Sequence, residues 1–167
     1  EDHPFCNNAN AAVRRTLWAA MPYDETLTGL EDIDLAHRAM RHGHAVVYES
    51  EATIVHVHEE TPARIRHRYF REAMALRRIL PDERFTLWDF LRLWPANTLS
   101  DLREAARESV LSQWATRIAI FRTMQFWGTY RGWQQRGELS RAVRQRLYYP
   151  GEEAGPAIED STDGDTP

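Results

Sequence analysis

The stretch from Thr28 to His58, TGLEDIDLAHRAMRHGHAVVYESEATIVHVH, decides the predicted fold. Glu31 and Asp32 follow a Thr-Gly turn, so both carboxylates lie in the first turn of a helix, where free backbone amides and the helix dipole favour negative charge. Apolar residues with helical spacing continue as far as Gly43, a typical residue just after a helix C-cap. The pattern predicts a helix between the acidic pair and this glycine.

Two short runs rich in β-branched residues follow, AVVY at 45–48 and TIVHVH at 53–58, and they are predicted to be strands. Residues two apart in a strand share a face, so His56 and His58 can point at one spot. Paired histidines occur in ordinary packing, but His-x-His on a strand is also a recurrent arrangement for a divalent metal. We therefore expect a helix start with acids to lie near a strand with imidazoles.

An asparagine-rich loop precedes this stretch and leads into a helix expected over about 11–21. Asn7, Asn8 and Asn10 have two interpretations. Asparagine is a common turn and N-cap residue, and its amide also offers a donor and an acceptor to the hydroxyls of a ligand. Pro22 ends the helix, and a polar loop connects it to the acidic pair.

The pattern after Thr61 is helical. Pro62 stands at a plausible first helical position. A short aromatic helix is expected to end at Pro95, a third helix to run over about 99–135 with a break at Gly128 or Gly132, and a last one to cover about 138–148.

Charge divides the 167 residues into three parts. Residues 1–60 carry 4 Arg and 11 acids, which gives −7, and residues 61–150 carry 17 Arg and 8 acids, which gives +9. Residues 151–167 carry 6 acids and no base, and their Gly, Pro, Asp and Glu content predicts a disordered acidic tail.

Composition indicates a soluble chain with one core or a core plus a helical piece. The single cysteine, Cys6, cannot form an intramolecular disulfide, and no stretch has the roughly 20 apolar residues of a spanning helix or the pattern of a signal peptide. We expect a cytoplasmic setting. The first residue is Glu rather than Met, which raises the expectation that the chain is cut from a longer one.

Five of the six tryptophans lie between Trp88 and Trp133, within the Arg-rich part. Such helices could rest on an anionic membrane surface, with aromatic rings at the interface and arginines at the headgroups. The same rings could instead be the core of a helical subdomain. No RNA- or DNA-binding motif accompanies the arginines, so nucleic acid is not an expected partner.

The order of these features resembles the C-terminal half of the catalytic domain of bacterial family-2 glycosyltransferases, enzymes of the GT-A type. The resemblance covers about 5–78 and rests on NNANAAVRRTLW, PYDETLTGLEDIDLAHR, GHAVVYESEA and TIVHVH. It implies an α/β fold, a partial GT-A, Rossmann-like half-domain with short strands, followed by an α-helical extension. The implied domains are 1–78 for the acceptor-side half, 79–150 for the Arg- and Trp-rich extension, and 151–167 for the tail.

The resemblance also implies roles for individual residues. Asp32 would be the general base of an inverting sugar transfer, and Glu31 would hold the acceptor hydroxyl. His56, with His58 as the alternative, would help hold Mg²⁺ or Mn²⁺ on the nucleotide diphosphate. Substrate-binding positions would be Asn8, Asn10 and Arg38. The partners would be a nucleotide-sugar donor and a saccharide or lipid-linked acceptor, as in polysaccharide synthesis for the bacterial cell envelope, at the inner face of the plasma membrane.

One departure from the family is large. No DxD motif precedes the asparagine-rich loop, and Asp32-Ile33-Asp34 lies inside the acidic-pair helix. The donor-binding half is therefore expected to be missing, and the chain to be a fragment that is inactive alone. The alternatives are a non-enzymatic module that docks on a membrane or a protein, and a metal-dependent hydrolase, which would need further ligands.

Overall fold

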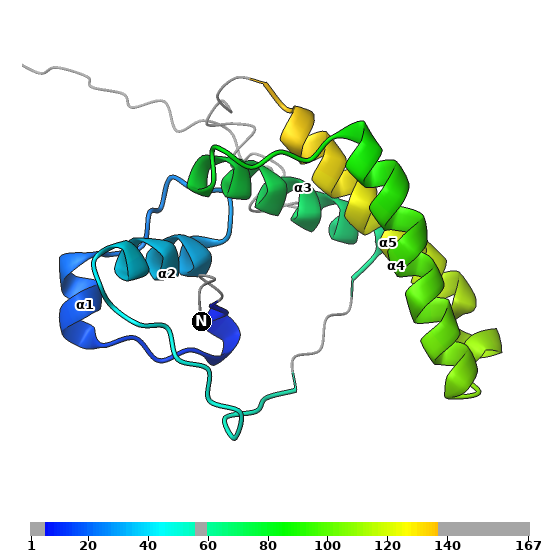
Figure 1. Ribbon diagram of the computed structural model, residues 1–167, viewed down its shortest axis with the longest axis horizontal. Coiled ribbons are helices and arrows are strands. Elements are labelled where there is room, and N and C mark those ends of the chain that lie inside the picture. Colours follow the sequence, from blue (N-terminus) through cyan, green and yellow to red (C-terminus); the bar gives the residue numbers. More distant parts are fainter. Residues whose placement is uncertain (1–5, 56–59, 137–167) are drawn as a thin grey trace, which may run out of the picture. The chain divides into compact units, whose positions relative to one another are not determined.

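The computed structural model describes residues 6–55 and 60–136, and these contain one 3-10 helix and five α-helices (Figure 1). In chain order they are η1 (Asn8–Asn10), α1 (Arg15–Ala20), α2 (Glu31–Arg41), α3 (Pro62–Ile79), α4 (Leu87–Arg107) and α5 (Leu111–Gln134).

Local signals account for several helix ends. Asn7 caps η1 by accepting a hydrogen bond from the Ala9 amide. Thr61 caps α3 and Pro62 follows it at the start of the helix, as predicted. Thr86 and Asp89 form a capping box at the start of α4. Gly43 follows α2 with φ of 80°, which confirms the predicted stop.

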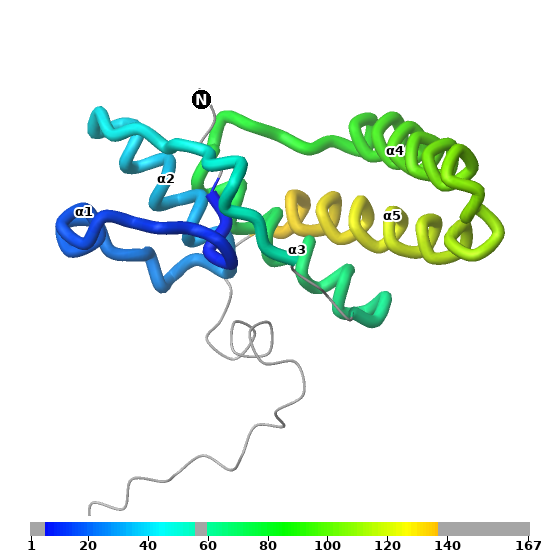
Figure 2. The backbone as a smooth tube through the Cα atoms, turned by 90° about the horizontal axis from the view of Figure 1, so that it is seen from below, coloured from blue at the N-terminus to red at the C-terminus, as the bar shows by residue number. Residues whose placement is uncertain are grey.

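The helical layer is built around α5. This helix lies along α3 on one side and antiparallel to α4 on the other (Figures 1 and 2). Phe90 of α4 has ring contacts with Trp127 and Tyr130 of α5 at centroid distances of 6.0 and 5.9 Å. Arg122 of α5 forms a two-pronged ion pair with Asp101 of α4, at 2.6 and 3.0 Å. Aromatic packing and a charge-assisted pair together hold α4 on α5.

Two glycines set the approach of α5 to α3. A Cβ atom on Gly128 would lie 2.5 Å from the Arg66 carbonyl oxygen. A Cβ on Gly132 would collide with the Phe70 carbonyl oxygen and lie 2.7 Å from the Ala73 Cβ. Small residues four apart let two helix backbones approach more closely than larger side chains allow. The break predicted at Gly128 or Gly132 was therefore wrong, because α5 is continuous through both.

The helix end predicted at Pro95 was also wrong, because α4 continues through this residue to Arg107. A proline inside a helix removes one hydrogen bond and costs about 3 kcal/mol. Packing on both sides of Pro95 offsets this cost: Trp94 stacks on Phe90 and its ring N–H donates to Thr123 at 3.2 Å, and Asp101 pairs with Arg122. The chain instead turns after α4 at Ser109, which has φ of 61°.

The predicted α/β class is contradicted, because residues 6–55 and 60–136 include no β-strand. Residues 45–48 and 53–55 of the predicted strands are irregular and largely open to solvent, with Val47 82% and Val55 91% exposed, and residues 56–58 of the second predicted strand lie outside the described residues. A strand needs a neighbour to pair its backbone amides and carbonyls, and the described part of the chain offers none. This overturns the partial GT-A, Rossmann-like half-domain and, with it, the resemblance to family-2 glycosyltransferases.

Some predictions lie outside the described residues. They are the helix over 138–148, the acidic tail over 151–167 and the side chains of His56 and His58. The domain boundary predicted between residues 78 and 79 is not tested and stays a prediction. Within the described ranges, no helix combines the length and the apolar character needed to cross a membrane.

Replacing Gly132 by alanine tests the close helix contact. Alanine favours a free helix by about 1 kcal/mol over glycine, whereas overpacking costs about 1–3 kcal/mol. We expect Gly132→Ala to lower the free energy of unfolding by about 1–2 kcal/mol, measured by urea unfolding with tryptophan fluorescence. Thr116→Ala, at an exposed position of α5, is the control and should be neutral or stabilising. A stabilised Gly132→Ala protein would show that α3 and α5 are not in backbone contact.

Candidate functional site

The acidic pair stands at the start of α2, after an unusual backbone segment. Gly29 has φ of 152° and Leu30, the N-cap, has φ of 60° in the left-handed region. A leucine in this region is uncommon and strained, and its side chain cannot cap the helix. The acids Glu31, Asp32 and Asp34 of the first turn therefore provide the negative charge that this helix end favours.

Asp32 joins the start of α2 to the asparagine-rich loop. One carboxylate oxygen accepts a hydrogen bond from the Asn8 backbone amide at 2.9 Å, and the other accepts one from the Ile33 amide at 2.8 Å. The contact between positions 8 and 32 brings together two sequence regions that were predicted to contribute to one site. The carboxylate is only partly buried, so its remaining lone pairs can reach a ligand.

Tyr23 completes the arrangement from the loop between α1 and α2. Its hydroxyl donates to the Asn8 side-chain oxygen at 2.9 Å. Burial raises the pKa of Tyr23, and the nearby Cys6, Asp32 and Glu31 raise it further. Burial also raises the pKa of the Cys6 thiol, with a further contribution from Asp32. These five residues, Cys6, Asn8, Tyr23, Glu31 and Asp32, are named the Asp32 cluster.

Arginines hold the loop that carries Tyr23. Arg38 of α2 pairs with Asp34 at 2.8 Å and donates to the Pro22 carbonyl at 2.8 Å. Arg78 of α3 donates to the carbonyl and the hydroxyl of Thr26 at 3.0 and 3.1 Å. The loop is thus fixed on both sides of Tyr23, at Pro22 and Thr26, which keeps the Tyr23 hydroxyl within hydrogen-bond distance of Asn8.

Two predicted substrate-binding residues have internal contacts. The guanidinium of Arg38 makes the two contacts just described, and the Asn10 amide donates to the Ala52 carbonyl. Arg38 fixes the start of the loop that carries Tyr23, and Asn10 ties the asparagine-rich loop to Ala52. Their roles toward a substrate stay predictions.

The metal site predicted at His56 and His58 falls on residues that the structure does not describe. In the rest of the chain, 6–55 and 60–136, His, Cys, Asp and Glu form no group of three or more that could hold a metal ion. The expected Mg²⁺ or Mn²⁺ stays a prediction that rests on the two histidines.

Three residues of this region were not predicted from the sequence: Cys6, Tyr23 and Glu72. Glu72 belongs to α3, and its Cγ would lie 4.0 Å from a Cβ on Gly29, so it sits beside the turn before α2. Burial raises the pKa of Glu72, against the lowering effect of Arg68, whose guanidinium is 4.0 Å away. Arg68 makes its shorter ion pair, 2.8 Å, with Glu60. No sequence pattern places an acid of α3 at this turn, because the proximity depends on tertiary packing.

Comparison of the chain with models of protein families, with curated proteins and with solved structures finds no match.

Glu72→Gln tests the buried carboxyl. Burial raises the pKa of Glu72 in the folded protein, so the folded state binds the proton more tightly than the unfolded chain does. The contribution of this group to the free energy of unfolding is therefore greatest below the unfolded pKa of about 4.3 and is lost as the pH rises through the folded pKa. At pH 7 the carboxyl is charged in the unfolded chain, and burying it costs free energy whether it stays charged or takes up a proton. A neutral amide of the same shape avoids this cost. We expect Glu72→Gln to raise the melting temperature at pH 7 and to have little effect near pH 4.

The matched control is Glu104→Gln, which removes an exposed carboxylate paired with Arg107 at 2.9 Å. It should change the melting temperature little at either pH, because exposed ion pairs contribute little. A melting temperature for Glu72→Gln that falls at pH 7 would mean that the ion pair with Arg68 outweighs desolvation.

Proposed function

We propose that the Asp32 cluster binds a hydroxyl group of a saccharide acceptor and that Asp32 is the general base when a sugar is transferred from a nucleotide-sugar donor. One observation supports this proposal above the others. At an accessible helix start, the Asp32 carboxylate accepts a hydrogen bond from the Asn8 backbone amide, and the Tyr23 hydroxyl donates one to the Asn8 side-chain oxygen.

The residue types suit this chemistry. Carboxylates accept hydrogen bonds from sugar hydroxyls, and amide and phenol groups can both donate and accept. In the transfer, a carboxylate oxygen of Asp32 takes the proton of the acceptor hydroxyl as the hydroxyl oxygen bonds to the anomeric carbon. The bond from that carbon to the diphosphate breaks with inversion, and the nucleoside diphosphate leaves. Glu31, next in the chain, would hold the hydroxyl in place.

The proposal rests on the site, since one chemistry recurs on unrelated folds. It does not depend on the α/β fold that the structure contradicts. The residues that bind the donor are not assigned, and a divalent cation, which would neutralise the leaving diphosphate, would be held with His56 and His58. A lipid-linked acceptor, a cytoplasmic setting at the inner face of the membrane and a role in cell-envelope polysaccharide synthesis are parts of the same proposal.

A second candidate function is a non-enzymatic docking module, and it has its own support. Trp88 is 71% exposed at the start of α4, which is unusual for so large an apolar side chain on a free surface. The two functions differ in what they require of Asp32, which only the transfer needs.

Asp32→Asn tests the transfer. Loss of a general base lowers rates by about 10²- to 10⁴-fold. We expect the release of nucleoside diphosphate from a panel of nucleotide sugars, with saccharide acceptors present, to fall by at least about 10²-fold in Asp32→Asn. The variant should keep its helical circular dichroism, because the asparagine oxygen can still accept the hydrogen bond from the Asn8 amide.

Glu25→Gln is the matched control, since it removes a carboxylate from the exposed part of the neighbouring loop. Its turnover should equal that of the natural protein. Equal turnover in Asp32→Asn would remove the general base from the mechanism. Absence of release with every donor, from protein that binds acceptor saccharide, would leave the cluster as a binding site and overturn the transfer.

A further inference from the structure

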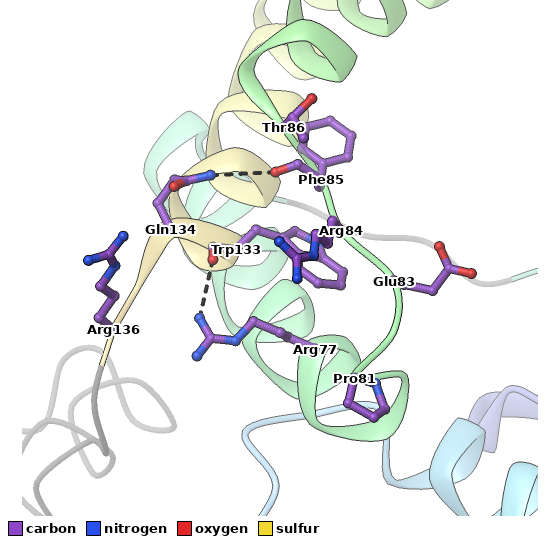
Figure 3. Close-up of a pocket in the computed structure, with 9 residues that line it drawn as sticks. All are labelled: Arg77, Pro81, Glu83, Arg84, Phe85, Thr86, Trp133, Gln134 and Arg136. Carbon is purple, nitrogen blue, oxygen red and sulfur yellow. Dashed lines mark hydrogen bonds between the residues drawn. The ribbon is translucent and has the colours of Figure 1, made fainter.

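A cavity of about 490 Å³ opens where the end of α3, the start of α4 and the end of α5 meet (Figure 3). None of the residues of the Asp32 cluster lines it. Its wall combines three arginines, one acid and two aromatic rings: Arg77, Arg84, Arg136, Glu83, Phe85 and Trp133. This composition suits an anionic group with an apolar neighbour.

The charges of the cavity are unequal. Three arginines and one glutamate give a net +2, and Glu83 projects to the opposite side of the 81–86 segment from Arg77 (Figure 3). Arg77 already donates to the Trp133 and Gln135 carbonyls at the end of α5, where a cation is favourable. Arg84 and Arg136 form no ion pair with any residue of the described ranges, so their guanidinium groups are available to a phosphate.

The first acid of α4, Asp89, forms no ion pair with Arg84 or Arg136. Asp89 accepts hydrogen bonds from the Thr86 amide and hydroxyl at 2.9 and 2.7 Å, and it pairs with Arg92 at 3.6 Å. Its hydrogen bonds with Thr86 lower the pKa of Asp89 below its ordinary value. This carboxylate serves the capping box.

Exposed apolar side chains adjoin the cavity along the chain. Directly after Phe85 and Thr86, Leu87 is 52% exposed, Trp88 71% and Leu91 50%. Positions i, i+1 and i+4 lie on one side of a helix, whereas Phe90 in the same turn packs against Trp127 and Tyr130. The first turns of α4 therefore have one apolar side in the protein and another in solvent.

We propose that this end of the helical layer docks on the surface of an anionic phospholipid bilayer. Arg84 and Arg136 bind lipid phosphates at the cavity, and Leu87, Trp88 and Leu91 enter the interface beside them. A soluble phosphate would satisfy the arginines but would leave the three apolar side chains in water. An anionic bilayer would bind the arginines through its phosphates and would also take the three apolar side chains out of water.

The experiment is sedimentation of the full chain with vesicles of phosphatidylcholine alone or mixed with phosphatidylglycerol, with no sugar present. We expect binding to the mixed vesicles only, weakening as salt rises. Arg84→Gln and Arg136→Gln should each weaken binding about fivefold, and Trp88→Ala roughly tenfold. Circular dichroism should show each variant folded, because Arg84, Arg136 and Trp88 are exposed.

Matched controls lie at the other end of the helices. Arg103→Gln and Trp114→Ala change an exposed arginine and an exposed tryptophan of α4 and α5 and should leave binding unchanged. Equal losses in the controls would place the contact elsewhere and overturn the proposal. Binding of inorganic pyrophosphate without vesicle binding, or equal binding to neutral vesicles, would overturn it as well.

Discussion

The contact of α5 with the backbone of α3 is the constraint on which the described structure depends. Gly128 and Gly132 face the carbonyl oxygens of Arg66 and Phe70 so closely that no side chain fits between them. Other buried residues of the helices are also small: Ala73 and Ala75 of α3 and Ala105 of α4. Close packing of small residues gains dispersion energy over a long contact rather than through a few large buried side chains.

The position of α3 then determines where the Asp32 cluster forms. The Thr28 hydroxyl donates to the Arg71 carbonyl at 2.9 Å, and Arg78 binds Thr26, so α3 anchors the loop that precedes α2. The anchored loop carries Tyr23 at one end and the strained Leu30 at the other. Strain of this kind persists only where surrounding contacts hold it. The conformation of the acidic helix start therefore depends on the position of α3, which is set by its packing on α5.

Local chemistry was predictable from the sequence, and tertiary consequences were not. Gly43 and Pro62 act through their own backbone preferences, so the end of α2 and the start of α3 were predicted correctly. Pro95 and Gly132 have equally clear local preferences, but packing on α5 and α3 overrides them. The strands predicted at 45–48 and 53–58 failed for a different reason: the described part of the chain offers no neighbouring strand to pair with residues 45–48 or 53–55. At the site, Asn8 and Asp32 were both predicted, whereas the proximity of Glu72 depends on α3.

The arginines show why net charge alone is a weak guide to function. Of the +9 in residues 61–150, part is used internally: Arg122 holds α4 on α5, Arg68 pairs with Glu60, and Arg78 fixes the loop before α2. Arg77 serves the end of α5. A binding surface is therefore expected where arginines form no ion pair within the described residues and where apolar side chains are exposed beside them. The start of α4 meets both conditions, since Arg84 lies three residues before Leu87 and four before Trp88.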